Sequence, residues 1–281
     1  MDKLTLIAPA KINWRLRITG QRSDGYHELN MFMQTISLHD ILKITPAQKN
    51  ELYVNGNHIP DCENNLIVKA ADTLSVFLRK KVTARFDLQK RIPSMAGLGG
   101  GSSDCAQALI GLNTLYHLNI PCEKLHALAI ALGSDVPFFL YGGLCQVEGI
   151  GERVTPLKEA PRASILLYHV KPGLSTPAVY KRFDECCASI GYDDPESFRM
   201  KLIQEDYSSL IPVNDLELPA ISILPDIKVV LEKLMSLGAV YTMMSGSGSA
   251  VYGVFQSTEC MRRAQNEIKE SIAAYTTARS A

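Results

Sequence analysis

The stretch from Pro93 to Asp104 combines residue types that suit the binding of a phosphate group. Four of the five residues from Gly97 to Gly101 are glycine, and two serines and an aspartate follow. Glycine costs roughly 0.5–1 kcal/mol relative to alanine inside a helix or strand, so this composition predicts a loop. Unshielded backbone N–H groups at the start of a helix form a cradle for an anion. The serine hydroxyls could cap that helix or contact phosphate.

Two common phosphate-binding motifs do not fit this loop. A Walker loop needs a lysine after Gly-x-x-x-x-Gly, and the sequence has no lysine between Lys90 and Lys124. The dinucleotide fingerprint fails as well, because its third glycine would fall at Ser102 or Asp104. A flexible connector that binds nothing is the structural alternative.

The segment Pro-x-x-Ala-Gly-Leu-Gly-Gly-Gly-Ser-Ser-Asp resembles the ATP loop of the GHMP kinases, the superfamily of galactokinase, homoserine kinase and mevalonate kinase. Three further segments resemble one branch of that superfamily, the 4-diphosphocytidyl-2-C-methyl-D-erythritol kinases. They are Ala8-Pro9-Ala10-Lys11-Ile12-Asn13, Arg-x-Asp-Gly-Tyr-His from Arg22 to His27, and Gly-Ser-Asp-Val-Pro-Phe-Phe from Gly133 to Phe139. The turn Ser245-Gly246-Ser247-Gly248-Ser249 resembles the third GHMP motif, although a hairpin turn there needs no function.

The resemblance implies ATP-dependent phosphorylation of the 2-hydroxyl of 4-diphosphocytidyl-2-C-methyl-D-erythritol, a step in non-mevalonate isoprenoid synthesis. It implies that Asp135 takes the hydroxyl proton, and that Lys11 keeps this carboxylate ionised and polarises the acceptor oxygen. Without the resemblance, Asp135 would more simply cap the next turn, and Lys11 would lie on a solvated strand face. ATP and Mg²⁺ are expected cofactors. No carboxylate is assigned to the ion, and Ser102 or Ser103 could contact it directly or through water.

The resemblance also implies two sets of binding residues. The predicted ATP-binding residues are Asn65, Lys90, Pro93, Ser94, Met95, Ala96, Gly97, Leu98, Gly99, Gly100, Gly101, Ser102 and Ser103. The predicted substrate-binding residues are Asn13, Tyr26, His27, Met33, Thr176, Tyr180, Gly246, Ser247 and Gly248. Asn65 is equally well explained as a helix cap.

Tyr26 and His27 follow a turn signal, Ser23-Asp24-Gly25, and such a pair most often packs locally. In the branch that the sequence resembles, the Tyr-His pair holds the cytosine of the substrate, and a later aromatic residue lies against it. Tyr180 is the residue that could play that part here, although the family often has phenylalanine. Cys105 also departs from the family, which usually has a small apolar residue after Ser-Ser-Asp.

Hydrophobic periodicity and turn residues predict the elements that must position these residues. The predicted helices span 66–78, 106–115, 122–132, 223–237 and 259–275. The predicted strands span 12–18, 35–45, 82–88, 144–147, 164–170, 239–244 and 250–255. Strand 12–18 is expected to be half-buried with one polar face, and residues 188–218 give no clear pattern.

Strand and helix signals alternate without a regular βαβ rhythm, which predicts an α+β protein. With 281 residues, two domains are expected, at 1–155 and 156–281. The resemblance implies an N-terminal ribosomal-protein-like domain with the glycine loop at 93–103 and a C-terminal ferredoxin-like domain.

The formal net charge is zero, with 29 residues of each sign, so neither nucleic acid nor a membrane surface is an expected partner. Seven cysteines, including the pair Cys186-Cys187, suggest free thiols in the cytoplasm. The expected partners are ATP and a cytidine diphosphate derivative, for a monomer or homodimer. Two alternatives stay open: another GHMP kinase acting on homoserine, mevalonate or a sugar, and a non-enzymatic RNA-binding module, for which zero net charge is unfavourable.

Overall fold

The structure is a computed structural model that describes residues 3–186 and 194–279, so Cys187 lies outside the described residues. Two compact units make up the chain. Unit 1 comprises Met1–Ala10, Leu38–Ile92 and Gly99–Tyr141, and unit 2 comprises Lys11–Ser37, Pro93–Leu98 and Gly142–Ala281. The boundary predicted between residues 155 and 156 stays a prediction.

Unit 1 combines strands with a layer of helices. The long strands β1 (Leu4–Gln21) and β2 (His27–Pro46) contribute residues to both units. In unit 1, the end of β2 pairs antiparallel with β5 (Ala84–Gln89), which pairs in parallel with β3 (Glu51–Val54). A tight turn joins β3 to β4 (Asn57–Ile59).

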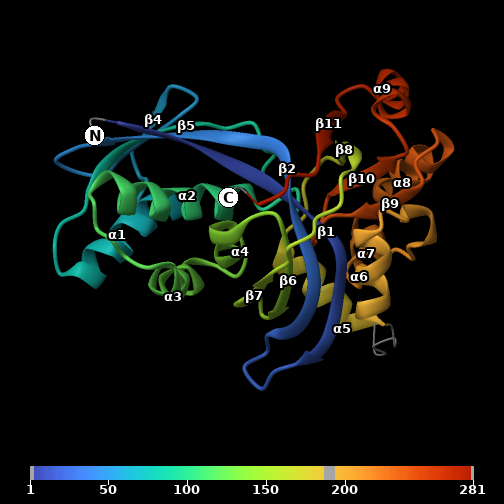
Figure 1. Cartoon of the computed structure of the whole chain (residues 1–281), viewed down its shortest axis with the longest axis horizontal. Helices are drawn as coiled ribbons and strands as arrows, with labels where there is room; N and C mark the ends of the chain where they lie inside the picture. Colours follow the sequence, from blue (N-terminus) through green and yellow to red (C-terminus); the bar gives the residue numbers. More distant parts are fainter. Residues whose placement is uncertain (1–2, 187–193, 280–281) are drawn as a thin grey trace. The chain divides into compact units, whose positions relative to one another are not determined.

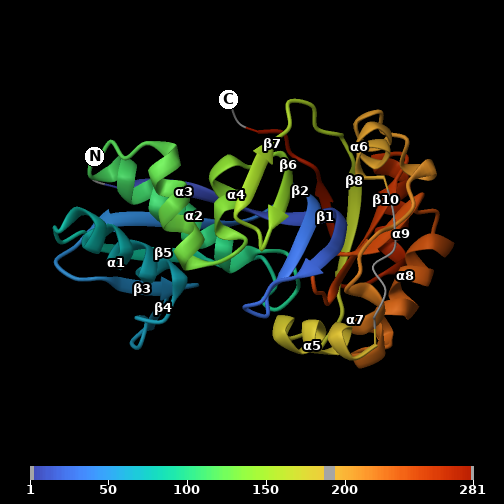
Figure 2. The same ribbon diagram turned by 90° about the horizontal axis from the view of Figure 1, so that it is seen from below.

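The helices of unit 1 are α1 (Leu66–Leu78), α2 (Gly100–Leu115), α3 (Cys122–Leu132) and α4 (Val136–Tyr141). Helices α1, α2 and α3 lie on one side of β5 (Figures 1 and 2). Helix α2 approaches the sheet closely at Gly111, where an added Cβ would lie 2.4 Å from Cδ1 of Ile44 and 2.5 Å from Cδ1 of Leu6. Glycine at this position therefore allows the helix that follows the glycine loop to pack tightly on the sheet.

Unit 2 contains a second sheet with the strand order β11-β8-β10-β9, in which all neighbours are antiparallel. The strands of that sheet are β8 (Ser164–His169), β9 (Tyr241–Met244), β10 (Ala250–Phe255) and β11 (Ile272–Tyr275). Unit 2 also contains β6 (Leu144–Gly149) and β7 (Arg153–Pro156), which continue the sheet of β2. Its helices are α5 (Thr176–Cys186), α6 (Pro195–Ile203), the 3₁₀ turn Tyr207–Ser209, α7 (Glu217–Ile223), α8 (Asp226–Ser236) and α9 (Thr258–Glu267). Helices α8 and α9 pack on this sheet (Figure 2). The order is that of a ferredoxin-like βαββαβ arrangement, as the resemblance implied.

Several predicted elements are confirmed at their ends. Helix α3 and strand β10 have the predicted bounds, and Gly133 ends α3. Helix α1 begins after Asn65, whose Oδ1 accepts a hydrogen bond from the N–H of Ile67 at 2.9 Å. Within residues 3–186 and 194–279, no helix has the length and apolar character needed to cross a bilayer.

The prediction that Gly97 to Ser103 form a loop was wrong at its end. Helix α2 begins at Gly100, so Gly100 and Gly101 lie in its first turn, after Gly99 in the left-handed conformation. No described side chain caps α2 there, so the capping role expected of the serines was also wrong. The first helical N–H groups thus stay available to a ligand.

The prediction of the last helix was also partly wrong. Helix α9 ends at Glu267, and Ile272–Tyr275 form β11, which pairs with β8. Pairing along β8 gives these four residues hydrogen bonds that a short helical extension would have to replace. The predicted helix 223–237 begins later, at Asp226, because Pro225 separates α8 from Ile223, the last residue of α7.

Strand β1 is not half-buried as predicted, because its polar face is buried as well. Lys11, Asn13 and Arg15 have exposed fractions of 3%, 0% and 2%. Arg15 donates to the side-chain and backbone oxygens of Asn30, at 2.6 and 2.8 Å. Buried charges need such partners, so this face of β1 is built for polar contacts inside unit 2.

Candidate active site

Lys11 presents a buried ammonium group in unit 2. Its Nζ donates to Oδ1 of Asn13 at 2.6 Å, and Nδ2 of Asn13 lies 3.4 Å from the sulfur of Met31. The backbone N–H of Lys11 donates to the carbonyl oxygen of Leu98 at 3.0 Å. The backbone of Lys11 is therefore hydrogen-bonded to the glycine loop. Its partner, Leu98, directly precedes Gly99, one of the residues expected to bind phosphate.

The loop segment Pro93–Leu98 has three consecutive carbonyl groups engaged with unit 2. The carbonyl oxygen of Ala96 accepts from the N–H of Ala250, and that of Gly97 accepts from Oγ of Ser245, both at 3.0 Å. The carbonyl of Leu98 is held by Lys11. In a trans peptide the following N–H points opposite to the carbonyl, so the N–H groups of residues 97, 98 and 99 point away from these partners. This arrangement suits a bound anion.

Gly97 is required by both conformation and space. Its φ is +72°, in the left-handed region, and an added Cβ would lie 2.1 Å from the carbonyl oxygen of Ser245. Met95 also has a positive φ of 55°, which is uncommon for a residue with a side chain, and its exposed fraction is 60%. The loop is therefore held in a specific, partly unfavourable backbone shape.

The turn between β9 and β10 lies against both Lys11 and the glycine loop. An added Cβ at Gly246, whose φ is +57°, would lie 3.1 Å from Nζ of Lys11 and 3.1 Å from the carbonyl oxygen of Gly97. Oγ of Ser247 and Oγ1 of Thr176 share a hydrogen bond at 2.8 Å. The structure thus brings together, within unit 2, predicted residues from four separate parts of the sequence.

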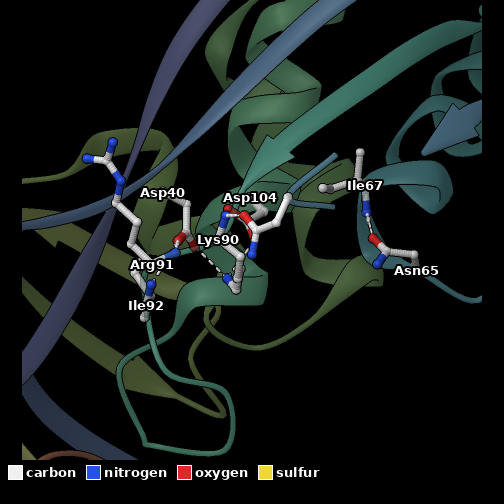
Figure 3. Close-up of polar contacts among 8 residues, drawn as sticks. Asp40, Asn65, Ile67, Lys90, Arg91, Ile92 and Asp104 are labelled. Carbon is white, nitrogen blue, oxygen red and sulfur yellow. Dashed lines mark hydrogen bonds and ion pairs between the residues drawn. The ribbon is translucent and has the colours of Figure 1, made fainter. Parts of the chain in front are cut away.

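In unit 1, Lys90 joins two buried carboxylates (Figure 3). Its Nζ lies 2.5 Å from Oδ2 of Asp40 and 2.8 Å from Oδ2 of Asp104. Oδ1 of Asp40 accepts from the N–H groups of Arg91 and Ile92, at 2.5 and 2.8 Å. Asp40 and Lys90 therefore hold the end of β5 next to the N-terminal part of α2, which carries Asp104. The binding of ATP by Lys90 stays a prediction.

Burial raises the pKa of the Asp104 carboxyl to about 7, even though Lys90 acts in the opposite direction. Burial alone would lower the pKa of Lys90, but attraction and hydrogen bonds to Asp104 and Asp40 outweigh it and raise that pKa. Oδ1 of Asp104 and Oγ of Ser103 are buried and have no hydrogen-bond partner among the described residues. Such polar atoms are costly unless a ligand or ion completes their hydrogen bonding.

An aromatic cluster surrounds His27 in unit 2. The His27 ring stacks on Tyr180 with 5.0 Å between centroids and 29° between planes, and Phe183 packs edge-on at 5.7 Å. Nε2 of His27 lies 2.7 Å from Oδ1 of Asp184. No base fits between rings at 5.0 Å, whereas Tyr26, with an exposed fraction of 61%, is accessible to one. The cluster brings the predicted substrate residues His27 and Tyr180 together, and their contact with a substrate stays a prediction.

For three other predicted site residues, Asp135, Met33 and Asn65, the structure gives a position but no indication of a ligand. Asp135 immediately precedes α4 in unit 1 and is half-buried. Met33 is fully buried on β2, in register with Cys145. Asn65 is accounted for by its cap on α1. Their proposed contacts with substrate or ATP stay predictions.

Sequence reasoning missed residues that support the site. Asp184 lies four positions after Tyr180 on α5, and residues with this spacing share one face of a helix. The sequence therefore contained a signal that Asp184 lies beside Tyr180. Asp104 belongs to the quoted glycine motif but was not predicted as a site residue. Asp40 and Asn214 stand in segments without a motif, and no sequence signal marked them. Asp40 holds Lys90, and Nδ2 of Asn214 donates to the carbonyl oxygen of Gly246 at 2.9 Å.

Comparisons with known proteins agree with this arrangement. The model of the GHMP kinases N terminal domain matches residues 65–143, and the model of the GHMP kinases C terminal matches residues 199–274. A 4-diphosphocytidyl-2-C-methyl-D-erythritol kinase of Citrifermentans bemidjiense is 39% identical over 280 residues, covering 96% of each chain. The enzyme of the same name from Geobacter sulfurreducens is 36% identical and covers 94% of each chain. The chain belongs to the GHMP kinases.

Solved structures support the same membership. A crystal structure of 4-(cytidine 5'-diphospho)-2C-methyl-D-erythritol kinase matches with a TM-score of 0.84 and 35% identity, covering 98% of this chain and all of the other. Homoserine kinase from Cytophaga hutchinsonii, at 16% identity and a TM-score of 0.71, shares the fold. The N-terminal family match contains the glycine loop and Asp135, and the C-terminal match contains the Gly246 turn. The predicted two-domain GHMP kinase fold is confirmed.

Proposed function

We propose that this GHMP kinase transfers the γ-phosphoryl group of ATP to the 2-hydroxyl of 4-diphosphocytidyl-2-C-methyl-D-erythritol, giving the 2-phosphate and ADP. The observation that carries the proposal is the cluster of His27, Tyr180 and Asp184, which lies in the same unit as Lys11 and the loop segment Pro93–Leu98. A nucleobase is the part of this substrate that such rings recognise. Full-length relatives carry the name of this kinase.

The glycine loop stabilises the charge of the transferring phosphoryl group and of the departing ADP. The N–H groups of residues 97, 98 and 99 point away from unit 2 partners because the preceding carbonyls are engaged, and the N-terminus of α2 follows. No reorganisation of the loop is then needed at the moment of transfer. Gly99, Gly100 and Gly101 allow the backbone to approach the phosphates.

Asp135 is the proposed general base, which accepts the proton of the 2-hydroxyl as its oxygen attacks the γ-phosphorus. Lys11 stabilises the negative charge that develops on the acceptor oxygen. Its burial and its bond to Asn13 orient the ammonium group. These roles are carried over from the family motifs that both residues match.

Mg²⁺ belongs to this proposal as the ion that accompanies ATP and neutralises phosphate charge. The buried Oγ of Ser103 and Oδ1 of Asp104 have no hydrogen-bond partner among the described residues, and oxygen ligands suit Mg²⁺. We assign the contact with the ion, direct or through water, to the hydroxyl of Ser103.

A cytoplasmic enzyme fits this reaction, because the cytoplasm supplies ATP. The proposed partners are small molecules, with neither nucleic acid nor membrane among them. A monomer or a homodimer is consistent with the chain. Size-exclusion chromatography with light scattering distinguishes these two states.

The reaction is tested by a coupled ADP-release assay with four acceptors. Turnover of 4-diphosphocytidyl-2-C-methyl-D-erythritol is expected to exceed that of mevalonate, homoserine and galactose by a factor on the order of 10³ or more in kcat/KM, as expected when a buried polar site is left unpaired. Preference for any of the other three acceptors would contradict the proposal.

A further inference from the structure

The segment from Val213 to Glu217 connects β1 to the turn between β9 and β10, all within unit 2. The N–H of Leu16 donates to the carbonyl of Val213 at 2.7 Å, and the N–H of Asp215 donates to the carbonyl of Leu16 at 3.0 Å. The carboxylate of Asp215 accepts from the side chain of Arg17 and the N–H of Ile18, both at 2.7 Å. The segment is therefore fixed to the strand that carries Lys11.

The side-chain amide of Asn214 hydrogen-bonds the turn between β9 and β10. Nδ2 donates to the carbonyl oxygens of Met244 and Gly246, both at 2.9 Å, and Oδ1 accepts from the N–H of Leu216 at 3.0 Å. Oε2 of Glu217 accepts from the N–H of Met244 at 2.8 Å. Both donors of the Asn214 amide are thus directed at one turn.

These contacts determine the orientation of one peptide group of the turn. With the carbonyl of Gly246 held by Asn214, the N–H of Ser247 points in the opposite direction. The turn needs such a constraint, because Gly246 and Gly248 both have positive φ and glycine readily adopts other conformations. Gly246 is also close to two predicted site residues, because a Cβ added to it would lie 3.1 Å from both Nζ of Lys11 and the carbonyl oxygen of Gly97.

We propose that Asn214 is a positioning residue for phosphoryl transfer, which acts by fixing the Gly246–Ser247 peptide beside Lys11 and the glycine loop. This inference rests on the proposed function. A displaced turn would alter the surroundings of Lys11 and Gly97, and small misplacements of reacting groups cost on the order of 10² in rate. His27 makes its ring and ion-pair contacts with Tyr180, Phe183 and Asp184, so the binding of the cytidyl base should change less than the rate of transfer, even though Thr176 of α5 shares a hydrogen bond with Ser247 of the turn.

The test compares Asn214→Asp with a matched variant, Asn113→Asp. Asn113 makes a similar pair of backbone hydrogen bonds, to the carbonyl and N–H of Ile120 at 3.0 Å, but it lies in unit 1 at the end of α2. Asn214→Asp keeps the side-chain shape and removes both donors. We expect kcat to fall roughly 10- to 100-fold, with KM for the cytidyl substrate within about threefold, and faster hydrogen exchange in peptides covering 244–249.

A pH profile separates positioning from a general loss of stability. The carboxylate introduced by Asn214→Asp would face two carbonyl oxygens, which disfavour its charged form and raise its pKa above the ordinary value. Protonation restores one donor, so the deficit in kcat should shrink as the pH is lowered. Asn113→Asp should lower Tm without this kinetic effect. Unchanged hydrogen exchange over 244–249 in Asn214→Asp would overturn the proposal, and so would a kcat within about twofold of the unmodified protein. Hydrogen exchange needs no substrate, so it decides the proposal even if the unmodified protein fails to phosphorylate the cytidyl acceptor.

Discussion

The proposed base and the buried ammonium are the single residues on which the chemistry depends most. Asp135→Asn keeps the side-chain shape but cannot accept the proton, so kcat should fall by about 10²–10⁴ with little change in the affinity for ATP. Lys11→Met should act similarly. Steady-state kinetics with isothermal titration of ATP measures both effects. Asp87→Asn, on β5 and paired with Arg85 at the surface, serves as the control. A near-normal kcat in both variants would remove these residues from the mechanism.

Asp104 should make stability depend on pH in an unusual direction. Its ordinary pKa of 3.8 rises to about 7 in the folded state, mainly through burial. Between these values the folded protein binds more protons than the unfolded chain, so this group lowers stability as the pH rises from about 4 to about 7, by at most about 1.4 kcal/mol per pH unit. Asp104→Asn lacks this component.

The measurement is Tm of both proteins between about pH 5 and 8 in buffer without Mg²⁺. The difference in Tm between Asp104→Asn and the unmodified protein should shift in favour of the variant as the pH rises toward about 7. Parallel curves would show that Asp104 is ionised throughout this range.

Tyr180 offers a test of base recognition by a single ring. Tyr180→Ala should raise KM for the cytidyl substrate with little change in kcat, because the ring binds substrate and transition state alike. Tyr180→Phe should be nearly silent, and His27→Ala should weaken the preference for the cytidyl over the uridyl compound. Tyr53→Ala is a matched control, since Tyr53 also contacts a histidine, His58, at 5.0 Å between centroids. If KM stayed constant in the Tyr180 and His27 variants, the nucleotide would bind elsewhere.

Among the elements, the glycine loop is fixed by its contact with the turn between β9 and β10. Gly97→Ala would place a Cβ 2.1 Å from the carbonyl of Ser245 at a positive φ, so we expect a loss of more than about 2 kcal/mol in unfolding free energy. Chemical denaturation measures this loss. Gly101→Ala is the control for stability, because an added Cβ there meets nothing within 4 Å. Equal stability of the two variants would contradict the packing described here.

Elements with local signals were predicted well, and those fixed by distant partners were not. Helix α3 has regular apolar spacing and a glycine stop, and both of its ends were predicted. Strand β11 was taken for helix because its residues become a strand only by pairing with β8, which lies far earlier in the chain. The buried polar face of β1 depends in the same way on Asn30 and Asp215, which the sequence of β1 does not reveal.

The candidate site divides similarly. Some site residues stand in recognisable motifs, namely Lys11, the glycine loop, His27 and the Gly246 turn. In the structure each of them lies beside another predicted site residue. Asn214 and Asp40 act through backbone groups of other segments, and any sequence position could supply such a partner. Their roles follow only from the three-dimensional contacts.

For the molecule as a whole, zero formal charge means that no general field attracts an anionic substrate. Affinity for phosphate must come from the oriented N–H groups of the loop and from individual buried cations such as Lys11.

The engagement of the loop carbonyls also has a consequence for protein synthesis. Ala96 and Gly97 are held by Ala250 and Ser245, partners that the ribosome adds much later. Contacts between such distant positions form late, after the chain between them has been made and ordered. A nascent chain that stops before Ser245 therefore contains the complete glycine motif but lacks the contacts that shape it, and it should be unable to bind the nucleotide while translation continues.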